Sequence, residues 1–277
     1  MLVKLINMKT ISPPKIPKVS IITVVRNGKD TIVRSMESVL SQDYPNIEYI
    51  VIDGASSDGT VDLIRQHQDQ LAFWSSEPDS GISDAFNKGI CRATGEWVGI
   101  LNADDWYEPD AVSKVMANAA GADVVHGVMR YWDQMSPVEM VYPDQRKMLK
   151  EMCLGHPTCF VRRELYSKYG LFDESYKYAM DYEFLIRLFL NGERFVQLGD
   201  IIANMQCGGV SDDGWMSACA EVRDAKIKNK MHKVSAWSWY GWQLVRRRVR
   251  WFLEKMGAKR VVDIYRARVS ASKKHRI

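Results

Sequence analysis

The chain has 277 residues, a mass of 31.8 kDa and a formal net charge of +4. Its composition, 46% hydrophobic and 26% charged, is typical of a globular protein and excludes collagen-like, disordered and disulfide-scaffold classes. The charge is divided unevenly, because residues 216–277 hold 17 basic and 4 acidic side chains, whereas residues 1–215 hold 21 and 30. An acidic body is therefore followed by a strongly basic C-terminal part.

The cysteines and the N-terminal segment bear on the compartment. The five cysteines form neither a CxxC zinc pattern nor a secreted disulfide framework, which predicts reduced thiols in a cytoplasmic protein. Residues 1–16 form a leader that runs into prolines and lacks the apolar core of a secretory signal. No stretch reaches the ~18–20 apolar residues that span a bilayer. We therefore expect a cytoplasmic protein that does not cross the membrane.

Strands and helices alternate in the first half of the chain. The β-branched run at 19–25 predicts a buried strand, and the apolar residues Ile32, Met36 and Val39 predict one face of the helix that follows. Further strands are expected at 47–52, 71–75, 97–101 and 123–129, with helices at 61–68, 83–93 and 109–118. This alternation predicts an α/β sheet with a ligand groove at the carboxyl ends of its strands. Residues 130–215 are less regular and contain one strong predicted helix at 179–190.

Acidic residues follow three successive predicted strands. They are Asp53, then Glu77 and Asp79, then Asp104 and Asp105. Each cluster could be an ordinary turn, because Asp is a common turn residue. Three clusters at strand ends in one sheet instead favour a shared crevice, where carboxylate oxygens bind Mg²⁺ or Mn²⁺ and leave positions open for phosphate oxygens.

Several nucleotide and hydrolase motifs are missing from the sequence. There is no GxxxxGK[ST] for a P-loop and no GxGxxG for a dinucleotide fold, nor is there HExxH or GxSxG. The remaining prediction is a nucleotide that is held through a metal ion instead of a glycine-rich loop.

Four segments carry a family resemblance and occur in order within residues 17–205. They read PKVSIITVVRNG, SVLSQDYPNIEYIVIDGASSDGT, EPDSGISDAFNKGICRATGEWVGILNADD and GHPTCFVRRELYSKYGLFDESYKYAMDYEFLIRL. Together they resemble the family 2 glycosyltransferases of the GT-A fold. The resemblance implies a Rossmann-like mixed sheet flanked by helices in a domain at 17–215. It also implies an inverting enzyme, dependent on Mn²⁺ or Mg²⁺, that moves a sugar from a nucleoside diphosphate to a hydroxyl group.

The resemblance assigns donor-binding roles to residues that follow the first four strands. Asp53 matches the position that accepts a hydrogen bond from the base, which favours UDP over GDP. Asp105 would lie in the sugar subsite. The complete set of expected nucleotide-sugar contacts is Thr23, Val25, Asn27, Asp53, Asp79, Asp84, Lys88, Asn102 and Asp105.

The segment Asn102-Ala103-Asp104 occupies the DxD position of the family. Asp104 is the expected metal ligand. Asn102 stands where the family has Asp, which removes a formal charge near the diphosphate and predicts a modest metal affinity. The amide of Asn102 can still hydrogen-bond the ribose.

The resemblance also implies a catalytic base, since inverting transfer needs a group that removes the acceptor proton. Asp181 matches that position, although a carboxylate there could instead interact with a helix dipole. Glu183 and Asp84 are the alternative bases. His156 could contact the acceptor or a donor phosphate, or be a structural hydrogen bonder. Trp106 could stack on a sugar or belong to the core.

The basic C-terminal part, residues 216–277, contains an amphipathic pattern. Apolar residues recur at spacings of three and four on one side, and Arg246, Arg247 and Arg250 fall on the other. Such a helix fits an interface with anionic lipid headgroups. The alternatives are packing on the catalytic domain or an oligomer contact, and, least favoured, nucleic acid. The apolar positions are Trp242, Val245, Val249, Phe252 and Met256.

These observations predict a function as well as a fold. The expected enzyme transfers a hexose or N-acetylhexosamine from a UDP-sugar to a lipid-linked glycan, in the synthesis of a bacterial surface polysaccharide such as O-antigen, capsule or exopolysaccharide. It would attach peripherally to the inner face of the plasma membrane through residues 235–277, bind no nucleic acid, and have an oligomeric state that the sequence leaves open. The alternatives are a metal-dependent nucleotidyltransferase and a degenerate, noncatalytic carbohydrate-binding protein.

Overall fold

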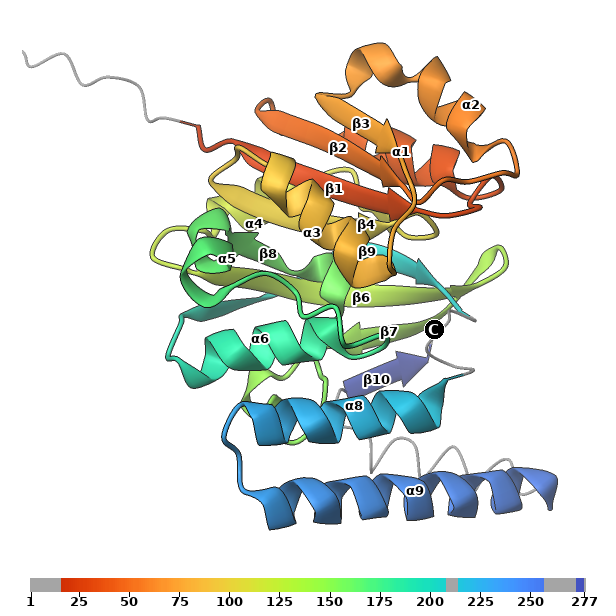
Figure 1. The fold of residues 1–277 in the computed structure, drawn as a ribbon, viewed down its shortest axis with the longest axis vertical. Helices are drawn as coiled ribbons and strands as arrows, with labels where there is room; N and C mark the ends of the chain where they lie inside the picture. The colour runs from red at the N-terminus through yellow and green to blue at the C-terminus, as the bar shows by residue number, and fades with distance from the viewer. Residues whose placement is uncertain (1–15, 208–213, 257–272, 277) are drawn as a thin grey trace, which may run out of the picture.

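The computed structural model describes residues 16–207, 214–256 and 273–276. Nearly all of the predicted leader and residues 257–272 of the predicted tail lie outside these ranges. The described strands form one ten-stranded sheet in the order β10-β7-β6-β8-β4-β1-β2-β3, with β9 paired to β6 and β5 paired to β9. Helices cover both faces of the sheet (Figure 1). The predicted mixed α/β sheet flanked by helices is therefore confirmed.

The half of the sheet that contains β1 is parallel. β1 (Val19–Val25) lies between β2 (Ile47–Asp53) and β4 (Trp97–Asn102), and β3 (Phe73–Ser76) pairs with β2. All residues of β1 are buried, which explains its β-branched run. These strands begin and end within two residues of the predicted bounds. The connecting helices are α1 (Ile32–Leu40), α2 (Thr60–Gln66), α3 (Ile82–Arg92) and α4 (Ala111–Ala117), with a short 3₁₀ turn at Gln68–Gln70.

The other half of the sheet contains antiparallel pairs, which the sequence did not predict in detail. β8 (Phe160–Arg162) runs antiparallel to β4, and β6 (Val124–Asp133) is antiparallel to β8 but parallel to β9 (Phe195–Gln206). The twelve residues of β9 were missed because their burial does not alternate. The remaining elements are β5 (Trp106–Tyr107), β7 (Ser136–Tyr142), β10 (Lys273–Arg276), α5 (Arg163–Tyr169), and the 3₁₀ turns Gln145–Lys147 and His156–Thr158.

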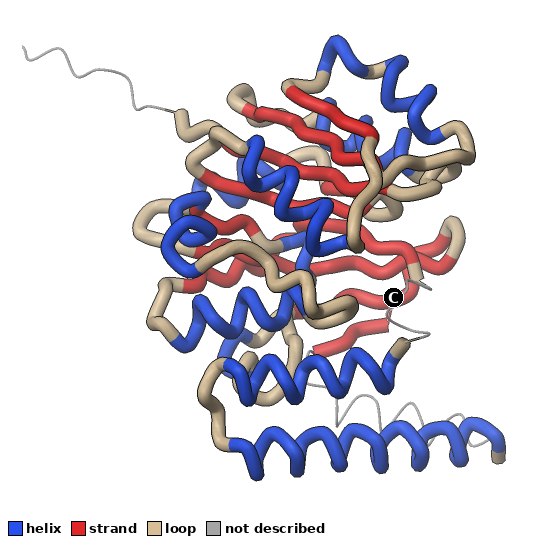
Figure 2. Tube along the Cα trace, in the orientation of Figure 1, coloured by secondary structure: helices blue, strands red, loops and turns tan. Residues whose placement is uncertain are grey.

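Helices lie on both faces of the sheet (Figure 2), and on each face the side chains form an apolar core. One core joins Phe86 of α3 to Ile22 of β1 and to helices α5 and α6 (Met180–Leu190). The other core joins Met36 of α1 to Val51 of β2 and to helices α2 and α4. Helices thus lie on both sides of the sheet, and the strand ends are the expected place for a ligand.

The C-terminal helices pack against the catalytic body. α8 (Trp215–Lys228) contributes the fully buried Ala225 to the same core as α6. α9 (Lys233–Lys255) lies along α8, where the Lys226 ammonium sits 3.9 Å from the centre of the Trp239 ring. The boundary predicted between residues 215 and 216 therefore falls inside a packed region of the molecule.

Helix α9 places its apolar residues outward. On its inner side Gln243 is only 6% exposed and donates a hydrogen bond to Glu151 at 3.0 Å. On its outer side the exposed fractions range from 45% at Val249 to 67% at Met256. The helix therefore packs on the rest of the molecule through its inner side, where Arg246 lies 3.7 Å from Glu151, and its apolar side faces away. The predicted stripe is exposed at all five positions, Trp242, Val245, Val249, Phe252 and Met256.

No helix in the described ranges combines the length and apolar character needed to cross a bilayer.

Candidate active site

The parallel strands end in one row. Val25 of β1 is the register partner of Asp53, Asp53 is the partner of Ser76 at the end of β3, and Val24 is the partner of Asn102 at the end of β4. The loops that follow β1, β3 and β4 line one cavity of about 1200 Å³. This volume exceeds that of a typical small-molecule pocket, which leaves room for two reactants.

The predicted site residues divide into two groups around this cavity. Eight of them line it: Val25, Asn27, Asp79, Asp84, Asn102, Asp104, His156 and Asp181. Six do not: Thr23, Asp53, Lys88, Asp105, Trp106 and Glu183.

Asp53 and Thr23 brace the pocket from behind. Asp53 is fully buried and accepts hydrogen bonds from the Ser56 backbone N–H at 2.9 Å and the Ser76 hydroxyl at 2.6 Å. Thr23 is also fully buried and accepts a bond from the Tyr49 hydroxyl at 3.0 Å. Both side chains therefore stabilise the structure around the cavity. Neither reaches the cavity surface, although the sequence predicted that both contact the nucleotide sugar.

Asn27 ties the loop after β1 to the loop after β2. Its backbone N–H donates to the Ser56 hydroxyl at 2.7 Å, and its side-chain oxygen accepts from the Ser57 N–H at 2.9 Å. Asn27 has a φ of 53°, in the left-handed region that Asn tolerates better than most residues. The loop after β2 therefore supports the loop after β1, which lines the cavity.

The acidic loop after β3 is held by its own backbone. Asp79 accepts a hydrogen bond from the Gly81 N–H at 3.0 Å, and Asp84 accepts one from the Ser80 N–H at 2.9 Å. This bond to Ser80 lowers the pKa of Asp84. Lys88 lies 3.3 Å from Asp84 and donates to a backbone carbonyl, so it steadies the loop from outside the cavity. A side chain at Gly54 would collide with Asp79.

The segment after β4 offers oxygen ligands to the cavity. The Asn102 amide donates to Asp105 at 3.1 Å, which leaves Asn102 Oδ1 and Asp105 Oδ1 buried without a partner in the described ranges. Burial, followed by the negative charge of Asp104, raises the pKa of Asp105 well above its usual range. Oxygen atoms are the donors that Mg²⁺ or Mn²⁺ prefers, and Asn102 and Asp104 line the cavity, so these two residues fit the expected metal, whereas Asp105 does not line the cavity.

The protein alone does not supply a complete metal cage. Among the described residues, no group of three or more His, Cys, Asp or Glu side chains could hold a metal ion. Asp104, with the Asn102 amide oxygen, would therefore hold the ion together with phosphate oxygens of the donor. Mg²⁺ commonly binds in this way, through one or two carboxylates plus substrate phosphates.

Trp106 belongs to the wall behind this segment. Its ring is stacked on the Arg34 guanidinium at 3.7 Å and lies 5.5 Å from the Trp132 ring. The Arg34 side chain also donates to the Asp104 carbonyl at 3.2 Å. Trp106 therefore holds Arg34 in place and does not offer its face to a sugar in the cavity.

Asp181 lies in the first turn of α6 and lines the cavity. Its Oδ1 accepts a hydrogen bond from the Tyr182 N–H at 2.7 Å. Burial, aided by the negative charge of Glu221, raises the pKa of Asp181 to about 6. A carboxylate with this pKa is ionised at pH 7 and is a stronger base than an exposed Asp, which suits proton abstraction.

His156 forms another part of the cavity wall. Its ring lies 5.4 Å from the Phe86 ring and 6.1 Å from the Phe172 ring. Burial lowers the pKa of His156 to about 4, so the imidazole is neutral at pH 7. It can exchange hydrogen bonds with a ligand, but it brings no positive charge to a phosphate.

Comparison with known proteins decides the family. Residues 20–186 match the family model Glycosyl transferase family 2. The chain belongs to this family. It is 32% identical over 179 residues to an uncharacterized glycosyltransferase of Mycobacterium tuberculosis, covering 62% of this chain and 68% of that protein. It is 34% identical over 119 residues to the succinoglycan biosynthesis protein ExoO of Rhizobium meliloti, covering 41% of this chain and 34% of ExoO.

Two solved structures share the fold. The S. aureus protein TarS, residues 1-349 in complex with UDP, superposes with a TM-score of 0.59 and 20% identity, over 79% of this chain and 68% of that one. The mannosyltransferase PcManGT from Pyrobaculum calidifontis, in complex with GDP-Man and Mn²⁺, gives a TM-score of 0.62 and 18% identity, over 93% and 77%. The expected GT-A fold is confirmed, and family membership makes the chain a glycosyltransferase instead of a nucleotidyltransferase.

The transferase cavity also includes residues that the sequence analysis did not single out. Lys177 and Tyr178 come from the loop before α6, and Arg246 comes from α9, where it lies 3.7 Å from Glu151. Lys177 and Tyr178 lie within the fourth segment of the family resemblance, a few residues before Asp181, whereas packing between distant segments brings Arg246 to the site. The only signal for Arg246 in the sequence was the basic character of residues 216–277.

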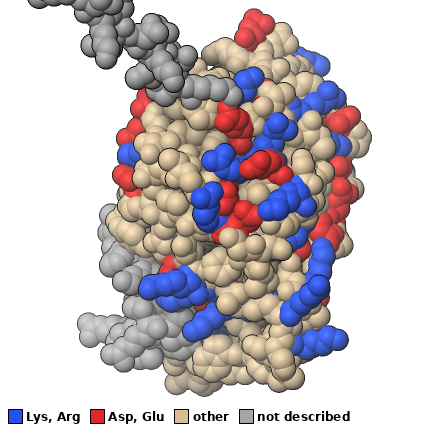
Figure 3. Space-filling model, turned by 90° about the vertical axis from the view of Figure 1, so that its left-hand side faces the viewer, with Lys and Arg blue, Asp and Glu red and all other residues tan. Residues whose placement is uncertain are grey.

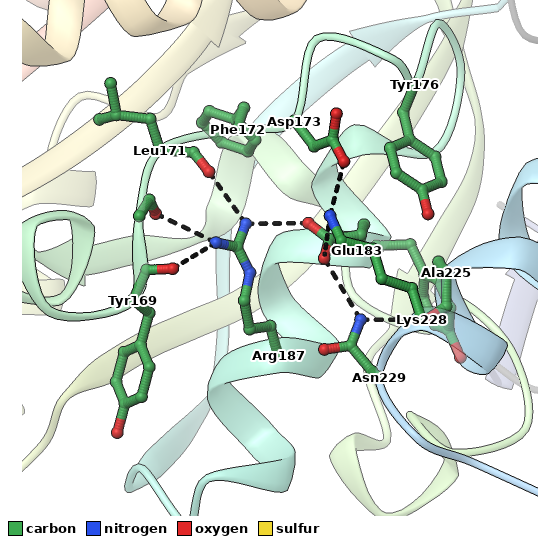
Figure 4. Close-up of polar contacts among 12 residues, drawn as sticks. Tyr169, Leu171, Phe172, Asp173, Tyr176, Glu183, Arg187, Ala225, Lys228 and Asn229 are labelled. Carbon is green, nitrogen blue, oxygen red and sulfur yellow. Dashed lines mark hydrogen bonds and ion pairs between the residues drawn. The ribbon is translucent and has the colours of Figure 1, made fainter.

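Glu183 belongs to a buried network between α6 and α8 (Figure 4). It is fully buried and lies 2.8 Å from Arg187, 3.3 Å from Lys228 and 3.3 Å from the Asn229 amide. Arg187 also donates to the backbone carbonyl of Leu171 at 2.9 Å. Glu183 therefore holds the transferase together and lies away from the cavity where a base would act.

Replacing this carboxylate should destabilise the fold. Glu183→Gln leaves Arg187 and Lys228 without their shared counter-charge, and we expect the free energy of unfolding to fall by about 3–5 kcal/mol. Urea denaturation measures the loss. The matched control is Asp62→Asn, which breaks an exposed ion pair with Arg65 and should cost less than about 1 kcal/mol. Equal losses in the two variants would contradict the structural role of Glu183.

Proposed function

We propose that this glycosyltransferase moves a hexose or N-acetylhexosamine from a UDP-sugar to a hydroxyl group of a lipid-linked glycan, with inversion. The observation that carries the proposal is that Asp181, whose pKa is raised to about 6, lines the same cavity as Asn102 and Asp104. One cavity thus combines a base with oxygen ligands for a metal–diphosphate group.

The residues support a single displacement. Asp181 would take the proton of the acceptor hydroxyl while that oxygen bonds to the anomeric carbon of the donor sugar. The bond from that carbon to the diphosphate breaks, UDP leaves, and attack from the opposite face inverts the configuration. A Mg²⁺ or Mn²⁺ ion held by Asp104 and Asn102 would neutralise charge on the leaving diphosphate.

The choice of UDP rests on the sequence resemblance alone, because the Asp53 carboxylate is bonded to Ser56 and Ser76 and does not line the cavity. The two solved neighbours carry different nucleotides, UDP in TarS and GDP-Man in PcManGT, so they support a nucleotide-sugar donor without selecting the base. The name of ExoO, a succinoglycan biosynthesis protein, supports a role in the synthesis of a polysaccharide.

Removing either carboxylate should abolish transfer. Asp181→Asn keeps the shape but not the basicity, and we expect UDP release to fall about 10²–10⁴-fold. Asp104→Asn should remove the stimulation by Mn²⁺. The measurement is UDP release from a panel of nucleotide sugars, with and without Mn²⁺, with the Asp62→Asn variant as control. Unchanged release in both folded variants would overturn the roles of Asp181 and Asp104, whereas no release by the unmodified protein from any donor in the panel would favour the noncatalytic carbohydrate-binding alternative.

The activity should depend on pH through Asp181. Since the base acts only when ionised and its pKa is about 6, kcat/KM should fall tenfold per pH unit below that value and level off above it. His156 stays neutral across this range, because its pKa is about 4, and adds no second transition. A profile from pH 5 to 8, measured at saturating Mn²⁺, tests this. A flat profile across this range would overturn the assignment of the base to Asp181.

We propose further that the outer side of α9 rests on the anionic inner face of the plasma membrane. The five apolar residues of the stripe are exposed together, and Arg248 and Lys255 on the same helix are exposed beside them. In Figure 3 the acidic side chains lie mainly over the upper part of the face, and the lower end, where α9 lies, shows basic and uncharged ones. Basic residues near such a surface contribute about 1 kcal/mol each.

Polar substitutions on the stripe should release the protein from lipid. We expect Trp242→Ser combined with Phe252→Ser to weaken binding to phosphatidylcholine vesicles containing phosphatidylglycerol more than about tenfold, because two large apolar side chains lose their burial. Flotation measures binding. Met135→Ser is the control, since Met135 is 88% exposed on the turn between β6 and β7. Unchanged flotation, or a change in oligomeric state alone, would overturn the lipid proposal.

A further inference from the structure

The segment that leads into α6, including its N-cap residue Ala179, is held by a residue from another helix. Glu221 of α8 accepts hydrogen bonds from three successive backbone N–H groups, those of Lys177 at 3.1 Å, Tyr178 at 2.7 Å and Ala179 at 2.8 Å. The first N–H groups of a helix have no partner within it, and α6 makes no side-chain cap of its own at Ala179. Glu221 therefore supplies the cap from 42 residues further along the chain.

The capped segment is part of the cavity wall. Lys177, Tyr178 and Asp181 all line the cavity, and Asp181 follows Ala179 by two residues. The carboxylate of Glu221 thus holds the backbone from which the proposed base projects. A shift of this segment would move Asp181 directly.

A second contact between α8 and α6 lies one helical turn further on (Figure 4). Lys228 and Asn229 each approach the Glu183 carboxylate at 3.3 Å, and the Glu183 N–H donates to the Ala179 carbonyl at 2.9 Å. The start of α6 is therefore fixed to α8 at both ends of its first turn. Since α8 lies beyond the family match at 20–186, this support comes from outside the matched domain.

We infer that Glu221 is a positioning residue for the catalytic base, fixing the backbone of residues 177–179 and the orientation of Asp181 against the acceptor. This inference rests on the proposed role of Asp181 as the base. In this role Glu221 makes α8 contribute to the active site, besides connecting the catalytic body to α9.

The charge of Glu221 also acts on Asp181. The ionisable groups that face Asp181 are Glu221 on α8 and Cys159, which precedes β8. Burial raises the pKa of the Cys159 thiol, so it is uncharged near pH 7. Glu221 is therefore the neighbouring charge that contributes to the raised pKa of Asp181, and its removal should make Asp181 a weaker base.

Two variants separate geometry from charge. Glu221→Gln retains an oxygen that can accept from Tyr178 and Ala179 but carries no charge, whereas Glu221→Ala removes both. Asp224→Asn is the control, because Asp224 lies on the same helix and pairs with Arg223 instead of capping α6. Thermal unfolding first confirms that each variant is folded.

Two measurements on the substrate-free protein test the inference. In hydrogen exchange by mass spectrometry, Glu221→Ala should speed exchange at residues 178–179 by about tenfold or more, because bonds to a charged acceptor are lost. In ¹³C-aspartate-labelled protein, the Asp181 carboxyl signal, assigned by its loss in Asp181→Asn, should titrate at lower pH in Glu221→Gln. The Asp224→Asn control should change neither. Unchanged exchange in Glu221→Ala, or an unchanged Asp181 titration in Glu221→Gln, would overturn the inference.

Kinetics complete the test and keep the two proposals distinguishable. With the UDP-sugar that gives the fastest UDP release, Glu221→Ala should lower kcat about 10–100-fold with little change in donor KM, because small displacements of a catalytic group are costly. The acid limb of the Glu221→Gln profile should move to lower pH. If Asp181→Asn stays active, the proposed function fails, while hydrogen exchange and titration still report on the Glu221 contact. If Asp181→Asn is inactive but Glu221→Ala retains kcat, the positioning role alone is overturned.

Discussion

The parallel register of β1 with β2 and β4 is the constraint on which the site depends. Because Val25 and Asp53 are register partners, and Ser76 and Asn102 end the neighbouring strands, the loops after these strands start from one edge of the sheet. The loops after β1, β3 and β4 therefore line one cavity at this edge, and the loop after β2 supports the first of them through Asn27.

Hydrogen bonds between these loops decide which polar residues remain available to a ligand. The Asp53 carboxylate accepts hydrogen bonds from Ser56 and Ser76 and so stabilises the structure behind the cavity. Asn102 and Asp105 are satisfied only in part, and each keeps one buried oxygen without a partner in the described ranges. A buried polar atom without a partner is costly, and a bound ion or ligand would remove that cost. Of these two residues Asn102 lines the cavity and Asp105 does not, so Asn102 is the one that can face a ligand.

The sequence predicted the parallel half well because its signals are local. The β-branched run of β1 and the apolar face of α1 each determine an element by themselves, and the motif at Asn102 and Asp104 marks the site. The rest depends on contacts between distant segments. The non-alternating β9, the cap from Glu221 and the approach of Arg246 leave no periodic signal, because their partners lie many residues away. The inward orientation of Asp53 and Thr23 was missed for the same reason.

The packing of α6 on α8, and of α8 on α9, shows how the basic residues of the C-terminal part are used in the structure. α8 uses Glu221 to hold α6 and uses basic side chains, such as Lys226 against Trp239, to hold α9. Some of the basic side chains therefore make contacts within the molecule, and the apolar side of α9 faces outward. In the proposed orientation on a membrane, that outward side would contact lipid while α8 keeps the base in register. The basic C-terminal part would then position the base through α8 and bind lipid through α9. Positioning the base requires contact with the catalytic body, which explains why this part packs there instead of forming a separate anchor.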